Sequence, residues 1–177
     1  MYAICGATGN IGSKIVLRLL EDNQEVRAIG RSGERMQFLG DRGAQPVVPD
    51  LADTDSLTKV FSGSEAVFVL IPPNPIAPDF RQYQNRIGES IAAAIKNAGV
   101  SYVVNLSSIG AHLSDGVGVV DGLHDQEERL SSLGNNVNIL HLRPGFFMEN
   151  HMMQVRTIKE QGAMASPLKA DQPIPQI

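Results

Sequence analysis

With 177 residues, the chain has the length of one ordinary domain and is long enough to bury a single sizeable core. Its 15 Lys and Arg residues against 19 Asp and Glu residues give a net charge of −4, so there is no positive excess to neutralise a nucleic-acid backbone. The lone Cys5 cannot form a disulfide within the chain, and no signal peptide or long apolar span is visible. We therefore expect a cytoplasmic protein without a nucleic-acid or membrane partner.

Short apolar runs alternate along the chain with longer segments of helical spacing, a pattern typical of the βαβ units that build parallel sheets. Strands are expected over residues 2–5, 25–29, 44–48, 66–71, 102–106 and 137–142. Helices are expected around residues 11–20, 54–61, 79–96 and 124–133, with Gly99 ending the third. Six strands with crossover helices predict an α/β protein with a doubly wound parallel sheet, the Rossmann fold.

A glycine-rich segment, Cys-Gly-Ala-Thr-Gly-Asn-Ile-Gly over residues 5–12, follows the first predicted strand. Gly6 permits a tight turn, Gly9 lets a ligand approach the backbone, and Gly12 allows the next helix to contact the strand closely. The N-terminus of that helix offers free N–H groups to a pyrophosphate. The segment therefore predicts a dinucleotide site rather than a purely structural turn, with contacts from Gly6, Thr8, Gly9, Asn10, Ile11 and Gly12.

Arg31 stands at the end of the second predicted strand, where the adenosine ribose of a dinucleotide would lie. An acidic residue there would bind the 2′-hydroxyl of NAD, whereas an arginine suits the 2′-phosphate of NADP. The sequence thus favours NADP(H) over NAD(H), unless Arg31 is only a solvated surface charge. Asp50, after the third strand, is expected either to pair with the adenine amino group or to cap the helix beginning near residue 53.

Three segments together resemble the NmrA-like family of atypical short-chain dehydrogenases/reductases: residues 6–12, Asn105-Leu106-Ser107-Ser108, and Leu-Arg-Pro-Gly-Phe-Phe-Met-Glu-Asn over residues 142–150. The resemblance covers essentially the whole chain. It implies an NAD(P)-binding Rossmann domain over residues 1–161. Family members continue for about a hundred further residues, so the tail 162–177 is expected to lead to an absent or truncated substrate-covering part.

The resemblance also implies function and contacts. The expected function is an NAD(P)H-dependent oxidoreductase acting on a quinone-like or other small planar acceptor; the alternative is a redox-sensing regulatory protein that binds NADP without turnover. A homo-oligomer or a regulatory protein partner fits either. Further cofactor contacts are expected from Leu51, Ile71, Pro72, Pro144 and Phe146. Phe147 and Asn150 would face the acceptor, and Met148, Met152 and Met153 would either join them or fill the core.

For catalysis, Ser108 matches the serine position that related dehydrogenases use, but their Tyr-x-x-x-Lys pair is missing. Residues 124–128 read His-Asp-Gln-Glu-Glu instead. His124 can exchange a proton near neutral pH, whereas Glu128 cannot replace a lysine charge. A structural alternative is that Asp125 and Glu128 form a capping box that opens the helix. The departure disfavours alcohol dehydrogenation more than quinone reduction, and no histidine has the spacing of a metal ligand.

Overall fold

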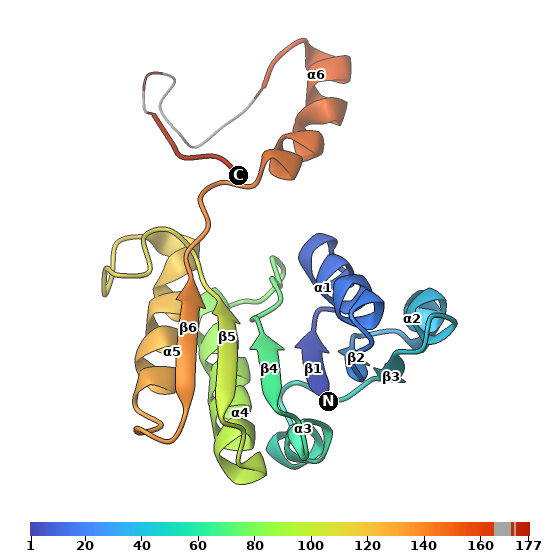
Figure 1. Ribbon diagram of the computed structural model, residues 1–177. Coiled ribbons are helices and arrows are strands. Elements are labelled where there is room, and N and C mark those ends of the chain that lie inside the picture. The colour runs from blue at the N-terminus through green and yellow to red at the C-terminus, as the bar shows by residue number, and fades with distance from the viewer. Residues whose placement is uncertain (165–170, 172) are drawn as a thin grey trace.

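Six parallel strands form one sheet in the order β3-β2-β1-β4-β5-β6 in the computed structural model, which describes residues 1–164, 171 and 173–177 (Figure 1). The strands are β1 (Tyr2–Cys5), β2 (Val26–Ile29), β3 (Gln45–Val47), β4 (Ala66–Val69), β5 (Tyr102–Leu106) and β6 (Asn138–Leu142). The α-helices are α1 (Asn10–Glu21), α2 (Gly33–Gly40), α3 (Thr54–Phe61), α4 (Phe80–Ala98), α5 (Asp121–Ser131) and α6 (Val155–Gln161). Two 3₁₀ segments are η1 (Gly118–Val120) and η2 (Met148–Gln154). The predicted doubly wound fold is confirmed.

The strand order reverses between β1 and β4. The chain runs outward from β1 to β3 and then crosses back to place β4 on the other side of β1. In open α/β sheets, ligands bind at the carboxyl ends of the strands where the order reverses. The glycine-rich segment after β1 therefore lies at the point where this fold places a ligand.

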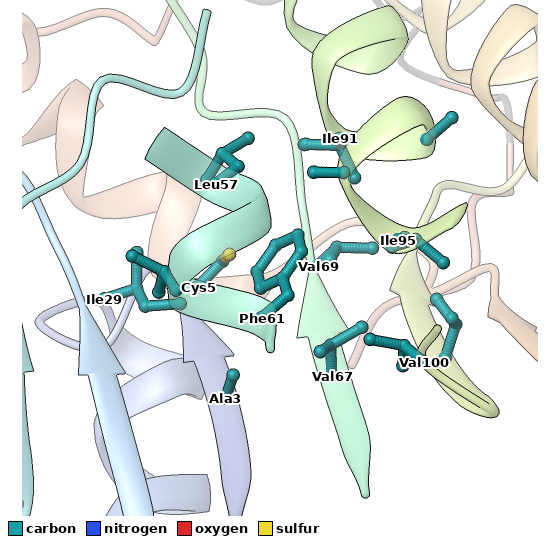
Figure 2. Close-up of a cluster of buried hydrophobic side chains, with 14 of the residues drawn as sticks. Ala3, Cys5, Ile29, Leu57, Phe61, Val67, Val69, Ile91, Ile95 and Val100 are labelled. Atoms are coloured by element: carbon teal, nitrogen blue, oxygen red, sulfur yellow. The ribbon is translucent and has the colours of Figure 1, made fainter. Parts of the chain in front are cut away.

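Helices cover the two faces of the sheet unequally. On one face, side chains of α3, α4 and α5 such as Phe61, Ile91 and Leu130 pack on the strands in one buried cluster, most of which Figure 2 draws. On the other face, α1 and α2 bury Val16 and Met36 against the sheet in a second cluster. Strands covered on both sides tend to be apolar, which is why β1 and β4 appear in the sequence as short uninterrupted hydrophobic runs.

The α1 face of the sheet is bare at its β6 edge. Leu140 and Leu142 on β6 are 55% and 40% exposed, and Tyr102 on β5 is 53% exposed. Helix α6 lies beyond the carboxyl ends of the strands rather than against this face (Figure 1). The methionines Met148, Met152 and Met153 near α6 are also exposed, so their interpretation as core filling is wrong. No helix among the described residues is both long and apolar enough to cross a membrane.

Two local expectations are corrected. Helix α2 was not expected; Ser32 caps it by accepting a hydrogen bond from the N–H of Arg35. Helix α5 begins at Asp121 rather than at residue 124, so Asp125 and Glu128 lie inside the helix and form no capping box. The end of α4 at Gly99, with a left-handed φ of 66°, agrees with the prediction.

The end of the chain returns to the loop after β6. The N–H of Phe146 donates to the carbonyl of Pro175, and the N–H of Ile177 donates to the carbonyl of Phe146. This pairing is a single parallel bridge between Phe146 and Gln176. Of the tail over residues 162–177, positions 165–170 and 172 lie outside the described residues.

Candidate functional site

Glycine is favoured at Gly6 by the backbone of the loop between β1 and α1, and at Gly12, in the first turn of α1, by a close contact with that loop. Gly6 has a φ of +67°, and the N–H of Gly9 donates to the carbonyl of Gly6 at 2.9 Å. A Cβ atom on Gly12 would lie 2.2 Å from that same Gly6 oxygen. The first and third glycines are thus required by the turn itself, whereas Gly9 has an extended backbone with φ −85° and ψ 171°.

The N-terminus of α1 is free to bind an anion. Gly9 is its N-cap residue, no side chain caps the helix, and no acidic residue lies in the first turn. The unpaired N–H groups and the partial positive charge of the helix end are therefore available to a phosphate. This is the geometry that the pyrophosphate of a dinucleotide requires.

A cavity of about 280 Å³ lies beside this loop, at the carboxyl ends of β1, β2, β3 and β4. Among its lining residues are six of those predicted to hold a cofactor: Gly6, Thr8, Gly9, Arg31, Leu51 and Pro72. Arg35, which was not predicted, also lines it. We call this space the first cavity.

Arg31 and Arg35 bring two positive charges to the first cavity. Within the described part of the chain, neither guanidinium group makes a hydrogen bond or an ion pair. Burial raises the pKa of the nearby Tyr83, and the charge of Arg31 opposes that shift. Guanidinium groups match phosphate oxygens in charge and geometry, so the pair suits a phosphate.

A second cavity, of about 200 Å³, lies on the other side of the glycine loop and shares Gly6, Gly9 and Leu70 with the first. Asn10, Ile11 and Gly12 line it from α1. Phe147 and Asn150, which were predicted to face an acceptor, line it from the segment after β6 together with Glu149. The two cavities lie on either side of the glycine loop at the reversal of strand order, where open α/β sheets bind ligands, and we call them together the groove.

Several predicted contacts lie outside both cavities. Asp50 accepts a hydrogen bond from the N–H of Ala52 at 2.9 Å, while Asp53 caps α3, so the capping role considered for Asp50 is wrong. Ile71 is buried. The carbonyl of Pro144 accepts from the N–H of Ile109, and Phe146 pairs with the end of the chain.

The catalytic candidates Ser108 and His124 both form hydrogen bonds with Ala111. The carbonyl of Ser108 accepts from the N–H of Ala111, and the carbonyl of Ala111 lies 2.9 Å from Nδ1 of His124. A carbonyl only accepts, so Nδ1 carries the proton and Nε2 is left for a ligand. No hydrogen bond joins Ser108 to His124 among the described residues.

An ion pair between the buried Glu127 and the partly exposed Arg143, which the sequence did not indicate, lies next to Ser108. The Nε of Arg143 donates to both carboxylate oxygens of Glu127, at 2.9 and 3.1 Å, and its Nη2 donates to Oε2. The hydroxyl of Ser107 donates to Oε1. Burial raises the pKa of Glu127, but the hydrogen bonds from Arg143 and Ser107 outweigh it, so the pKa lies below its usual range and the carboxyl is ionised at neutral pH.

Other chemistry finds little support in the described residues. No group of three or more His, Cys, Asp or Glu side chains is placed there to hold a metal ion. Burial raises the pKa of the Cys5 thiol to about 12, which keeps it protonated at neutral pH. A thiolate mechanism at this edge of the sheet is therefore disfavoured.

The fold, the glycine loop and the groove define a Rossmann-type α/β protein. A family model described as the NmrA-like family matches residues 2–177, and the chain belongs to that family. It is 30% identical over 168 residues to an NAD(P)H azoreductase of Xenophilus azovorans, covering 95% of this chain and 56% of that protein. It is 31% identical over 168 residues to an NmrA-like family domain-containing oxidoreductase of Penicillium ochrochloron, covering 87% of this chain and 49% of that protein.

Solved structures give the same fold. An NADPH-dependent quinone oxidoreductase of Escherichia coli, complexed with NADPH, has a TM-score of 0.74 and 25% identity, over 92% of this chain and 55% of that one. A triphenylmethane reductase of Citrobacter sp., complexed with NADP(H), has a TM-score of 0.74 and 21% identity, over 90% and 54%. The chain spans about half the length of the curated relatives it matches.

Proposed function

We propose that the protein is an NAD(P)H-dependent oxidoreductase that prefers NADP(H) and reduces a quinone-like or other small planar acceptor. The observation that carries this proposal is the groove: a free helix N-terminus at the glycine loop, with a pair of arginines at one end. Relatives described as an NAD(P)H azoreductase and an NADPH-dependent quinone oxidoreductase support it.

The first cavity would hold the adenosine half of the cofactor. Arg31 and Arg35 would bind the 2′-phosphate, and Leu51 and Pro72 would contact the adenine. Asp50, next to Leu51, remains a candidate partner of the adenine amino group. The α1 N-terminus would bind the pyrophosphate, and Pro144 and Phe146 would approach the nicotinamide from the loop after β6.

The second cavity would hold the nicotinamide half and the acceptor. A bound nicotinamide supplies the hydride. The chain must orient the acceptor, a role for Phe147 and Asn150, and provide a proton. Because Nδ1 of His124 donates to Ala111, only a protonated imidazole could deliver a proton, from Nε2. A reduced quinone can also be protonated by solvent, so the missing Tyr and Lys do not forbid this reaction.

The lack of the Tyr and Lys pair that related dehydrogenases use also favours a second candidate function. A protein that binds NADP without a strong proton donor is suited to sensing the dinucleotide and passing its occupancy to a partner, a protein or a second copy of the chain. Such a protein would need the first cavity and the glycine loop but no acceptor site. Binding and turnover distinguish the two functions.

The test is the loss of NADPH absorbance in the presence of a naphthoquinone, with binding measured separately. An oxidoreductase consumes NADPH in proportion to the quinone added. His124→Gln is expected to slow this consumption about tenfold or more without weakening NADPH binding. Stoichiometric binding without consumption would support the sensing function instead.

A further inference from the structure

The carboxylate of Glu127 joins the exits of two strands. Ser107 directly follows β5 and Arg143 directly follows β6, and both side chains donate hydrogen bonds to Glu127 on α5. The Glu127 side chain is only 5% exposed, so protein donors rather than water satisfy its charge. Three elements of the sheet edge therefore meet at one carboxylate.

The two strand exits continue side by side beyond the sheet. The N–H of Ser107 donates to the carbonyl of Leu142 at 2.8 Å, and the N–H of Ile109 donates to the carbonyl of Pro144 at 2.9 Å. These main-chain bonds hold the exits to each other. Among the described side chains, Glu127 ties both of them to α5.

The segment that follows Arg143 forms one wall of the second cavity. After Arg143 the chain continues to Phe147, Glu149 and Asn150, which face the glycine loop across that cavity. The first cavity, by contrast, is lined by β1, β2 and the segments that follow β1 to β4, with no residue of β5 or of the segment after β6. A shift of Arg143 would therefore change the second cavity and leave the first intact.

We propose that Glu127 is a positioning residue: by holding Arg143 and Ser107, it sets the width of the second cavity and hence the affinity for the nicotinamide half of the dinucleotide. This inference rests on the proposed function. The positioning role requires the Glu127 carboxylate to be ionised, because the Arg143 guanidinium and the Ser107 hydroxyl both donate hydrogen bonds to its oxygens.

Comparing the binding of two ligands distinguishes a positioning role of Glu127 from a general effect on the stability of the protein. NADPH would fill both cavities, whereas adenosine 2′,5′-bisphosphate would fill only the first. Glu127→Gln keeps the size of the side chain and removes its charge. Its matched control is Glu128→Gln, at the next and exposed position of α5.

For folded Glu127→Gln, we expect the Kd for NADPH to rise roughly ten- to a hundredfold, as when a supporting group of a site is lost. The Kd for adenosine 2′,5′-bisphosphate should stay within about twofold of wild type, since the first cavity has no residue of the segment after β6. Glu128→Gln should change neither value. If Glu127→Gln does not fold, Arg143→Lys keeps the charge but loses the paired donors, and should show the same selective loss.

Wild-type NADPH affinity in the folded variants would overturn the inference and leave the proposed function standing. An equal loss for both ligands would also overturn it, because that result would show a general effect on stability. A wild-type protein that binds neither ligand would refute the proposed function, and the positioning role with it.

Discussion

At the scale of single residues, the three glycines of the glycine-rich segment are needed for different reasons. Gly6 is needed because its φ is positive. Gly12 is needed because a Cβ atom there would lie 2.2 Å from the carbonyl oxygen of Gly6. Gly9 has a backbone that other residues adopt, and a Cβ atom there would lie 3.2 Å from the Gly6 oxygen. Its lack of a side chain therefore serves the ligand more than the turn.

Gly9→Val is accordingly expected to weaken NADPH binding about a hundredfold or more, because the branched side chain blocks the pyrophosphate and removes charge-assisted hydrogen bonds of about 1.5–3 kcal/mol each. Its melting transition and circular dichroism should stay near wild type. Gly12→Ala is the contrasting variant, and should lower the melting temperature as well. Unchanged NADPH affinity in a folded Gly9→Val would show that the loop is only structural.

At the scale of elements, the close approach of α4 and α5 places Glu127 at the sheet edge. A Cβ atom on Gly122 of α5 would lie 2.7 Å from the Cβ of Gln84 on α4. A Cβ atom on Gly88 of α4 would meet only the ends of the Gln126 and Arg129 side chains, at 2.2 and 2.7 Å. The first contact cannot be relieved by side-chain rotation, whereas the second can.

Gly122→Ala should therefore destabilise the protein by about 1–3 kcal/mol through overpacking, even though alanine gains roughly 1 kcal/mol of helix propensity. Gly88→Ala should cost less, because its neighbours can swing away. Chemical denaturation of both variants measures the difference. The prediction fails if Gly122→Ala is as stable as wild type.

Some elements of the fold could be predicted from the sequence and others could not. Strands such as β1 and β4 are found because buried parallel strands are apolar runs, and the glycine loop is found because its spacing is local. Helix α2 was missed because Gly30 precedes it and its own first and last residues, Gly33 and Gly40, are glycines, which usually interrupt a helical pattern. Arg35 was missed with it, since that residue reaches the cavity only as part of α2.

Glu127 was missed for a different reason. Its partners Ser107 and Arg143 lie 20 and 16 residues away along the chain. A glutamate in a helix rich in charged residues is usually exposed, so burial of this one is decided by tertiary packing. The alternative of a capping box formed by Asp125 and Glu128 is excluded because η1 leads directly into α5, which begins at Asp121.

At the scale of the whole molecule, the sheet separates packing from ligand binding. The two buried clusters lie on its faces, while the groove, both arginines and the Glu127 anchor lie at its carboxyl edge. The exposed edge residues Arg31 and Arg35 can therefore be changed without opening the core. This separation lets affinity be measured independently of folding.

The central claim, that the groove binds NADP(H) with the 2′-phosphate at the arginines, is tested most directly by calorimetry with NADPH and NADH on wild type and Arg31→Ala. Wild type is expected to bind NADPH more tightly than NADH by about 1–3 kcal/mol, the contribution of a charge-assisted contact. Arg31→Ala should remove most of that difference and leave NADH binding unchanged. Equal affinities in wild type, or no binding of either cofactor, would contradict the account.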